Sequence, residues 1–249
     1  MGAPPRLAVT GLSKTYGRTL ALSDVSIDFH AGEVHAVLGE NGSGKSTLVK
    51  ILSGIVRQDA GTVLFNGQKL VANGPAEFTA KGFATVFQEV LIAPDRSVVD
   101  NVLLGRGGLW RWRVRPRERN RVAAEAIARI SRSGLPLEAR AGDLPLALQQ
   151  IVVIARALAR DSDVLILDEA TAALDHADRD AVFVEIESLA RRGRVVIFIS
   201  HRMDEVARLA HRVSVLRNGR WIGTLPRGEA DSARLLAMMA PDRARQRHE

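Results

Sequence analysis

The chain carries a glycine-rich loop between two apolar runs, and its residues 39–47 read Gly39-Glu40-Asn41-Gly42-Ser43-Gly44-Lys45-Ser46-Thr47. The run at 34–38 before the loop is typical of a buried strand, and the run at 48–52 after it predicts a helix. Glycines let the backbone curl with its N–H groups pointing inward, and the start of a helix adds further free N–H groups. The stretch therefore predicts a strand, a phosphate-binding loop and a helix in succession.

The loop fits the Walker A pattern G-x-x-x-x-G-K-[ST]. Lys45 places a positive charge where the β- and γ-phosphates of a nucleotide would lie, and the hydroxyl of Ser46 suits Mg²⁺. We interpret the whole loop as the nucleotide-binding residues: Gly39, Glu40, Asn41, Gly42, Ser43, Gly44, Lys45, Ser46 and Thr47. ATP and Mg²⁺ are the expected ligands.

The composition bounds the remaining possibilities. A chain of 249 residues with 46% hydrophobic and 25% charged residues is long enough for one sizeable α/β domain or two small ones. It has no cysteine, which excludes disulfides and thiolate chemistry. It also shows no apolar run long enough to span a membrane and no signal peptide. We therefore expect a cytosolic protein whose membrane role, if it has one, goes through a partner. The net charge of +7 leaves nucleic acid, anionic lipid and nucleotide open as partners.

Periodicity predicts an α/β fold with a mostly parallel sheet. Strands are expected at 7–9, 21–29, 61–67, 83–87, 164–168 and 195–199, with a hairpin over 213–224. Helices are expected at 121–132, 178–192 and 232–239. The helical period dominates from about 89 to 159, which we interpret as a helical subdomain inserted into the sheet core. The first strands form a small antiparallel region. Residues 1–226 are the expected ATP-binding domain, and 227–249 a basic tail.

Four further motifs follow the Walker A loop in order. Gln88 ends a predicted strand, and the apolar run 164–167 ends in Asp168 and Glu169. Ala173-Leu174-Asp175 comes next, and then Ser200-His201 follows another apolar strand. With these motifs in this order, the chain resembles an ATP-binding cassette (ABC) ATPase from about residue 7 to residue 224. The resemblance implies a P-loop NTPase core.

The resemblance gives these residues roles that agree with their chemistry. Asp168, with Ser46 and Gln88, is expected in the Mg²⁺ shell, and Glu169 is expected to orient or deprotonate the attacking water. Gln88 could instead hold that water, and His201 is expected to bond the γ-phosphate. Lys45 completes the catalytic group, and Asp175 corresponds to the family's D-loop. Taken alone, Glu169 could be a surface acid after a strand.

Tyr16 is the only tyrosine of the chain and lies in a predicted turn. Its ring could stack on adenine, since every base offers a π face. The alternative is a half-buried turn tyrosine without a ligand.

The exact residues of three segments are similar to one branch of the family. The loop 39–47, Phe87-Gln88-Glu89 and Ser200-His201-Arg202-Met203-Asp204-Glu205-Val206 are similar to the ATPases of bacterial importers for ribose and related monosaccharides. The resemblance implies transmembrane permease subunits, an extracytoplasmic solute-binding protein and a peripheral place on the cytoplasmic face of the membrane. Those ATPases usually carry two cassettes in one chain, whereas this chain has one.

The family's signature sequence is altered here. The pattern Leu-Ser-Gly-Gly-Gln falls on Leu144-Pro145-Leu146-Ala147-Leu148, and the residues after it keep the register. In the family, the signature of one cassette caps the ATP held by another through a serine hydroxyl and glycine amides. Pro145 has neither a hydroxyl nor an N–H, and Leu146 and Ala147 add side chains where glycine allows close approach. A second cassette is therefore expected, as a heterodimer partner or as a copy of this chain.

Two other functions remain open from the sequence. Arginines alternate with tryptophans in Trp110-Arg111-Trp112-Arg113 and continue to Arg121, a pattern that can bind nucleic acid or lipid head groups. The simpler interpretation is a solvated loop entering a helix, and no nucleic acid is expected. The other function is a cassette that holds ATP and clamps a dimer with weak turnover, because the signature is altered.

Overall fold

The computed structural model describes residues 4–71, 73–106, 115–132 and 134–240. Its centre is a sheet with the strand order β10-β9-β3-β8-β7-β6. These strands are β3 (Val34–Leu38), β6 (Phe83–Val86), β7 (Val164–Asp168), β8 (Val195–Ile199), β9 (Arg212–Arg217) and β10 (Arg220–Pro226). All neighbours pair in parallel except β9 and β10, which form the predicted hairpin.

A second sheet, fully antiparallel, has the order β2-β1-β4-β5. It consists of β1 (Leu7–Tyr16), β2 (Thr19–Phe29), β4 (Ala60–Phe65) and β5 (Gln68–Lys69). The first strand is longer than the predicted 7–9 because its pairing with β2 shifts register between Val9 and Leu12. Gly11 lies in that irregular stretch with φ of 62°, and its carbonyl oxygen would be 2.4 Å from a Cβ on Gly61. The bulge hides the strand from an alternation test.

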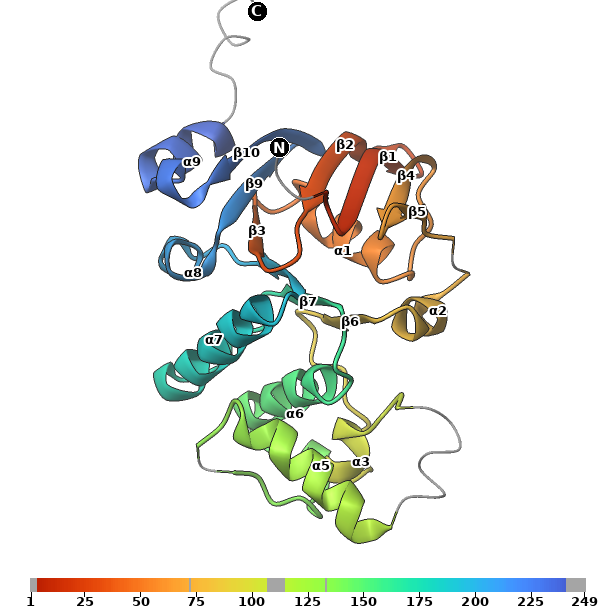
Figure 1. Cartoon of the computed structure of the whole chain (residues 1–249), viewed down its shortest axis with the longest axis vertical. Helices are drawn as coiled ribbons and strands as arrows, with labels where there is room; N and C mark the ends of the chain where they lie inside the picture. Colours follow the sequence, from red (N-terminus) through yellow and green to blue (C-terminus); the bar gives the residue numbers. More distant parts are fainter. Residues whose placement is uncertain (1–3, 72, 107–114, 133, 241–249) are drawn as a thin grey trace, which may run out of the picture.

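Helices surround the parallel sheet. They are α1 (Lys45–Leu52), α2 (Pro75–Ala80), α3 (Val98–Val102), α5 (Pro116–Ala128), α6 (Leu146–Leu158), α7 (His176–Arg191), α8 (Met203–Leu209) and α9 (Ser232–Met239). In Figure 1, α3, α5 and α6 gather at the end away from the antiparallel sheet. They lie between β6 and β7 in the chain, which confirms the inserted helical subdomain. Among the described residues no helix combines the length and apolar content that a bilayer crossing requires.

The predicted helix at 121–132 was wrong at both ends. Helix α5 begins at Pro116, where a proline suits the first turn because its missing N–H would have no partner there. It ends at Ala128, and the N–H groups of Ile130 and Ser131 fold back onto Ile127 O. The tail helix α9 matches its predicted range 232–239.

Three inner strands, β3, β7 and β8, are short, and each of their residues is buried. In β7 and β8 alternate side chains enter two separate cores, so both faces are covered. Leu165 and Leu167 pack with α6 and α7, whereas Val164 and Ile166 pack with α1 and the antiparallel sheet. Strands covered on both faces are expected to be wholly apolar, and this places their polar residues at the strand ends.

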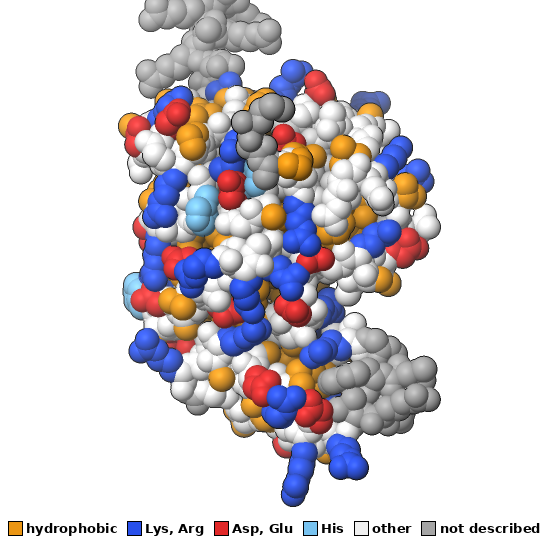
Figure 2. Space-filling model, in the orientation of Figure 1, with side chains coloured by type: hydrophobic (Ala, Val, Ile, Leu, Met, Phe, Trp, Pro, Cys, Tyr) orange, Lys and Arg blue, Asp and Glu red, His pale blue; other side chains and the backbone are white. Residues whose placement is uncertain are grey.

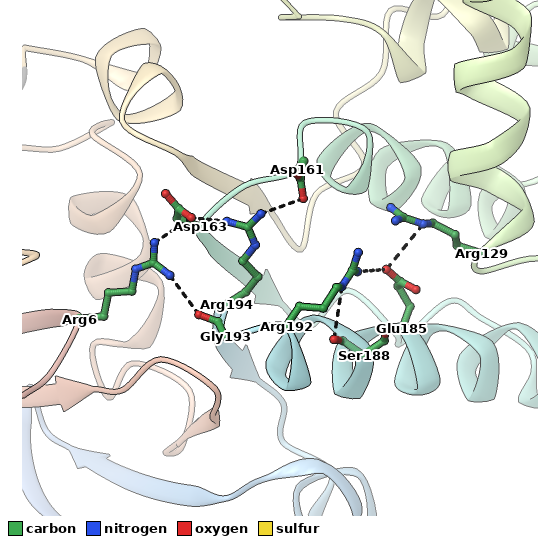
Figure 3. Close-up of polar contacts among 9 residues, drawn as sticks. All are labelled: Arg6, Arg129, Asp161, Asp163, Glu185, Ser188, Arg192, Gly193 and Arg194. Atoms are coloured by element: carbon green, nitrogen blue, oxygen red, sulfur yellow. Dashed lines mark hydrogen bonds and ion pairs between the residues drawn. The ribbon is translucent and has the colours of Figure 1, made fainter. Parts of the chain in front are cut away.

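Ion pairs fasten the sheet at the edge where β7 and β8 begin (Figure 3). Arg6, just before β1, pairs with Asp163 at 2.8 Å and donates to Gly193 O at 3.0 Å. Arg194 also contacts Asp163 and lies 3.1 Å from Asp161. This network ties the antiparallel sheet to the parallel one at the amino ends of the parallel strands. The carboxyl ends of these strands, at the opposite edge, take no part in it.

A second set of contacts in Figure 3 joins the helical subdomain to the core. Glu185 of α7 accepts from Arg192 at 2.9 Å and lies 3.8 Å from Arg129, the residue that follows α5. Both arginines are partly exposed, so the energetic contribution of each pair is small. The Arg129–Glu185 pair places the end of α5 beside the second half of α7.

Buried His35 predicts an acid sensitivity of the fold. It lies in β3 with no exposed surface, its Nε2 is 2.8 Å from Ser214 Oγ, and its ring meets Phe29 edge-on at 4.7 Å. Burial, and then the charges of Arg212 and His30, lowers the pKa of His35 to about 3. The unfolded chain binds this proton near pH 6.5 and the folded chain does not, so stability is lost as the pH falls from 6.5 toward 3.

We expect this histidine alone to remove about 2 kcal/mol of unfolding free energy between pH 6.5 and pH 5. His35→Gln should flatten that part of the stability profile, since glutamine does not titrate. Denaturant unfolding at a series of pH values measures the slope. His176→Gln, at an exposed position at the start of α7, is the control and should keep the wild-type slope. An unchanged slope in His35→Gln would contradict the assignment.

Candidate functional site

The carboxyl ends of four neighbouring parallel strands meet at one edge of the central sheet. In spatial order these are β3, β8, β7 and β6. The Walker A loop follows β3, and Ser200 and His201 follow β8. Asp168 ends β7 and Glu169 comes directly after it, and Gln88 comes shortly after β6. Motifs far apart in the sequence are therefore brought to one edge, where ligands of open parallel sheets bind.

The glycines of the loop are required for two different reasons. A Cβ on Gly44 would lie 2.6 Å from both Ala21 O and Leu22 Cδ2, and a Cβ on Gly39 would lie 2.4 Å from Leu216 O. These positions need glycine because neighbouring strands press against the loop. Gly42 has nothing within 4 Å of its ideal Cβ, but its φ of 80° disfavours any other residue. The loop is thus held in shape by the surrounding sheets.

Lys45 and Ser43 show that the loop fits a phosphate group. Lys45 is 7% exposed, and its ammonium donates to two loop carbonyls, Gly39 O at 2.7 Å and Glu40 O at 3.0 Å. Burial lowers the pKa of Lys45, against the opposing charges of Glu169 and Asp168. Ser43 Oγ is buried and has no hydrogen-bond partner among the described residues. A buried cation bonded only to carbonyls, beside an unsatisfied hydroxyl, suits an anion with several acceptor oxygens.

Asp168 is an acid suited to a cation. It is 6% exposed, and burial, followed by the negative charge of Glu169, raises its pKa to about 6, against Lys45 and Lys50. A divalent cation would favour its charged form. Ser46, one residue after Lys45, is exposed at the start of α1. The described residues hold no group of three or more His, Asp or Glu that could enclose a metal. Few protein ligands together with phosphate oxygens match the preference of Mg²⁺.

Glu169 adopts a backbone conformation that the sequence did not predict. Its φ is +48°, in the left-handed region, and its N–H donates to Ile199 O at 2.9 Å on β8. Such a conformation costs about 1–3 kcal/mol in a residue with a side chain and is held by the surrounding structure. It turns the carboxylate toward His201, whose Nδ1 is 3.4 Å from Glu169 Oε1. The acid and the imidazole thus face each other.

The other predicted residues lie in different settings. Gln88 is exposed just past β6, and Tyr16 ends β1 with 43% of its surface exposed and Lys14 Nζ at 5.6 Å from its ring centre. Asp175 begins α7, and its side chain accepts from Asp178 N at 2.8 Å as an N-cap. Capping explains why an aspartate suits this position locally.

The altered signature forms the start of α6. Pro145 is the N-cap residue, and no side-chain hydrogen bond among the described residues caps this helix end. Gln149 Nε2 donates to Leu144 O at 2.7 Å, and Leu146 is 60% exposed. Ala147 and Leu148 are half-buried in the first turn. The position therefore keeps a helix start, with an apolar side chain in place of a hydroxyl.

The basic run is described only from Arg115 onward, and its tryptophans and residues 110–114 lie outside the described residues. Arg119 pairs with Asp100 at 2.5 Å, and Arg121 pairs with Glu118 and Glu125 at 2.6 Å. These arginines have carboxylate partners within the chain.

Sequence reasoning missed Glu205. It is 1% exposed although it is an acidic residue, and acidic side chains are rarely buried without partners, so its residue type does not predict its burial. Its carboxylate accepts from Thr171 and Ser200, which places it directly behind the catalytic candidates.

Three comparisons agree with this geometry. The "ABC transporter" family pattern matches residues 22–172. A "Ribose import ATP-binding protein RbsA 1" of Rhizobium johnstonii is 43% identical over 235 residues, which are 94% of this chain and 46% of the relative. A "Putative ribose/galactose/methyl galactoside import ATP-binding protein 1" of Burkholderia lata is 41% identical over 95% of this chain and 46% of its own length. The chain spans about half the length of these curated relatives.

Solved structures show the same fold. The ADP conformation of MJ1267, an ATP-binding cassette of an ABC transporter, superposes with a TM-score of 0.80 at 25% identity, covering 95% of this chain and 98% of that one. The dimeric bacterial cassette MJ0796 gives a TM-score of 0.77 at 24% identity, covering 88% and 98%. Since the family pattern covers more than half of the residues and the motifs meet at one sheet edge in the family's order, the chain belongs to the ABC transporter family.

Proposed function

We propose that this chain binds and hydrolyses ATP as the cassette subunit of a membrane importer for simple sugars. The observation that carries the proposal is the meeting of a phosphate-binding loop, a carboxylate pair and a histidine at the ends of four adjacent parallel strands. The sugar class is supported by relatives at 43% and 41% identity that are named for ribose and galactoside import.

In this proposal each residue has a distinct task. The amides of the loop 39–47 and the Lys45 ammonium bind the β- and γ-phosphates. Ser46, Asp168 and Gln88 would hold Mg²⁺, which when bound neutralises charge on those phosphates. Glu169 accepts a hydrogen bond or proton from the attacking water, and His201 keeps one ring nitrogen toward Glu169 and the other for the γ-phosphate. Tyr16 offers its exposed face to the adenine ring.

The proposal also implies an assembly. An importer requires transmembrane permease subunits and, for the sugars named in its relatives, a solute-binding protein outside the membrane. We place this chain on the cytoplasmic face, bound to the permease, and paired with a second cassette. Pairing is supported by the structural similarity to a cassette solved as a dimer.

Loss of Lys45 should weaken nucleotide binding. Lys45→Ala removes a charge-assisted contact worth about 1.5–3 kcal/mol, so we expect the dissociation constant for MgATP to rise roughly 10- to 100-fold. Titration calorimetry of the nucleotide-free chain measures it. Lys69→Ala, on the exposed strand β5, is the matched control and should bind like the wild type. Equal affinities of the Lys45→Ala variant and the wild type would contradict the proposed phosphate site.

The cargo class needs a separate experiment. The chain is co-purified with its permease, reconstituted in liposomes with the solute-binding protein, and supplied with internal ATP. The proposal expects uptake of labelled ribose or galactoside that stops when Lys45 is replaced by alanine. ATP hydrolysis without uptake of any monosaccharide would leave the ATPase assignment intact and overturn the sugar assignment.

A further inference from the structure

We propose that Glu205 is a positioning residue for hydrolysis, which holds Glu169 and His201 face to face by tying together the two loops that carry them. The inference rests on the proposed function for the chemistry that these two residues perform. It concerns a residue that touches neither of them directly in the contacts described and lies behind them in the first turn of α8.

One carboxylate oxygen of Glu205 bridges the hydroxyl groups of two residues. Glu205 Oε2 accepts from Thr171 Oγ1 at 3.0 Å and from Ser200 Oγ at 2.8 Å. Thr171 is two residues past Glu169, in the loop after β7. Ser200 immediately precedes His201, in the loop after β8. One carboxylate oxygen therefore joins the loop of the proposed base to the loop of the histidine, from the side away from solvent.

The side chain of His201 is mostly exposed and is packed against few other side chains. Its side chain is 62% exposed, so its position is set by the backbone on either side. Ser200 Oγ, held by Glu205, accepts from Arg202 N at 3.1 Å, and Arg202 Nη1 lies 3.4 Å from Glu205 Oε1. Glu205 thus fixes the residues immediately before and after the imidazole.

The negative charge of Glu205 is buried and is balanced by its neighbours. A carboxylate with 1% exposure is strongly disfavoured without hydrogen bonds and counter-charges. Glu205 has two hydroxyl donors on one oxygen and two guanidinium groups near the other, those of Arg202 and, at 4.0 Å, Arg179. Burial and pairing restrict where this carboxylate can go, which makes it a rigid link.

Arg179 connects the same carboxylate to a third element. It lies in the first turn of α7, and its N–H donates to Asp175 O at 3.0 Å. Its Nε and Glu205 Oε1 both lack a hydrogen bond within the described part of the chain. Asp175, which corresponds to the family's D-loop, thus borders the link between Glu169 and His201 through Arg179.

Cutting the link should affect turnover more than nucleotide binding. Within the described residues no hydrogen bond or ion pair joins Glu205 to the loop 39–47. The strained backbone of Glu169 and the exposed imidazole of His201, by contrast, lie on the two loops that Glu205 holds. Misplacement of catalytic groups by about 1 Å can lower rates by up to 10²-fold.

The test compares variants of nearly equal shape. Glu205→Gln keeps the volume but cannot offer acceptors to both hydroxyls and both arginines at once. Thr171→Val removes one hydroxyl, and Thr171→Ser restores it. Asp180→Asn weakens a 2.5 Å surface pair between α7 and α8, Arg208–Asp180, which does not include Glu205, and is the control. Each variant is measured for kcat, the KM for ATP and the unfolding temperature.

A second readout needs no nucleotide. The His201 ring signals of the nucleotide-free chain are followed by NMR, with His201→Gln to assign them. We expect Glu205→Gln to lower kcat about tenfold with KM within twofold, and to shift or broaden the His201 signals. Thr171→Val should do the same more weakly, and Thr171→Ser and Asp180→Asn should match the wild type.

Several results would overturn the inference. Wild-type kcat and unmoved His201 signals in Glu205→Gln would do so. If Glu205→Gln does not fold, wild-type behaviour of Thr171→Val decides against it in the same way. If Thr171→Ser and Thr171→Val lower kcat equally, Thr171 acts through its packing and not through its hydroxyl group. A wild-type chain that does not hydrolyse ATP with its partner would overturn the proposed function, and the NMR comparison would still decide whether Glu205 positions His201.

Discussion

Glu169→Gln is expected to lower ATP turnover roughly 10³-fold while MgATP still binds, because an amide cannot take a proton from the attacking water. The structure supports this separation of binding from chemistry. Glu169 lies at the end of β7, 3.4 Å from His201 Nδ1, whereas the phosphate loop follows β3, with β8 between them. Removing one negative charge near Lys45 and Asp168 also leaves the phosphate site no less positive.

Phosphate release and nucleotide affinity are measured on the same preparation. Glu187→Gln, a change of the same kind on the outer part of α7, should keep the wild-type rate and serves as the control. A Glu169→Gln variant that turns over ATP like the wild type would exclude Glu169 as the base. Loss of both binding and turnover would mean that the carboxylate helps to shape the nucleotide site itself.

Prediction from the sequence worked where burial was complete. The strands at 164–168 and 195–199 appear at the predicted residues because every residue in them is buried on both faces, so the apolar run and the strand coincide. The loop 39–47 lies between β3 and α1, as predicted, because its pattern joins a strand to a helix in the geometry that phosphate binding requires. These three segments predicted a mostly parallel sheet, whereas the order of its strands is known only from the structure.

Prediction failed where the deciding contacts are distant in sequence. The bulge at Gly11 depends on the close approach of Gly61, and nothing near β1 in the sequence shows it. Glu205 accepts a hydrogen bond from Thr171, which is 34 residues earlier in the chain and which only the fold brings beside it. The left-handed backbone of Glu169 is likewise fixed by its bond to Ile199 on β8. Residue identity alone carries no trace of such conditions.

The altered signature leads to the second large effect. In the family, the start of the helix corresponding to α6 caps an ATP held by another cassette. Here that start has Pro145 as its N-cap, no side-chain capping hydrogen bond within the described part of the chain, and Leu146 60% exposed. A dimer of this chain with itself would cap both ATP molecules with these residues. Each lost charge-assisted hydrogen bond to a γ-phosphate costs about 1.5–3 kcal/mol, or roughly 10- to 100-fold.

A partner with an intact signature changes this outcome. The ATP on this chain's Walker A loop would then be capped by the partner and face Glu169, so that this site could hydrolyse it. The opposite site, capped by Pro145 and Leu146, would hold nucleotide with weak turnover. We therefore propose an asymmetric heterodimer in which this chain supplies the phosphate loop, the carboxylates and the histidine, and its partner supplies the working signature.

Rebuilding the signature tests this arrangement on the chain alone. The purified wild-type chain should show low ATPase activity, and the variant combining Pro145→Ser, Leu146→Gly, Ala147→Gly and Leu148→Gln should gain roughly 10- to 100-fold. Serine restores both a helix cap and a donor, and the glycines remove the side chains that block close approach. Adding Glu169→Gln to the rebuilt chain should abolish the gain, which locates it at this chain's own site. Full activity of the unmodified chain, with no increase on rebuilding, would mean that the altered helix start caps ATP well enough and that no second kind of cassette is needed.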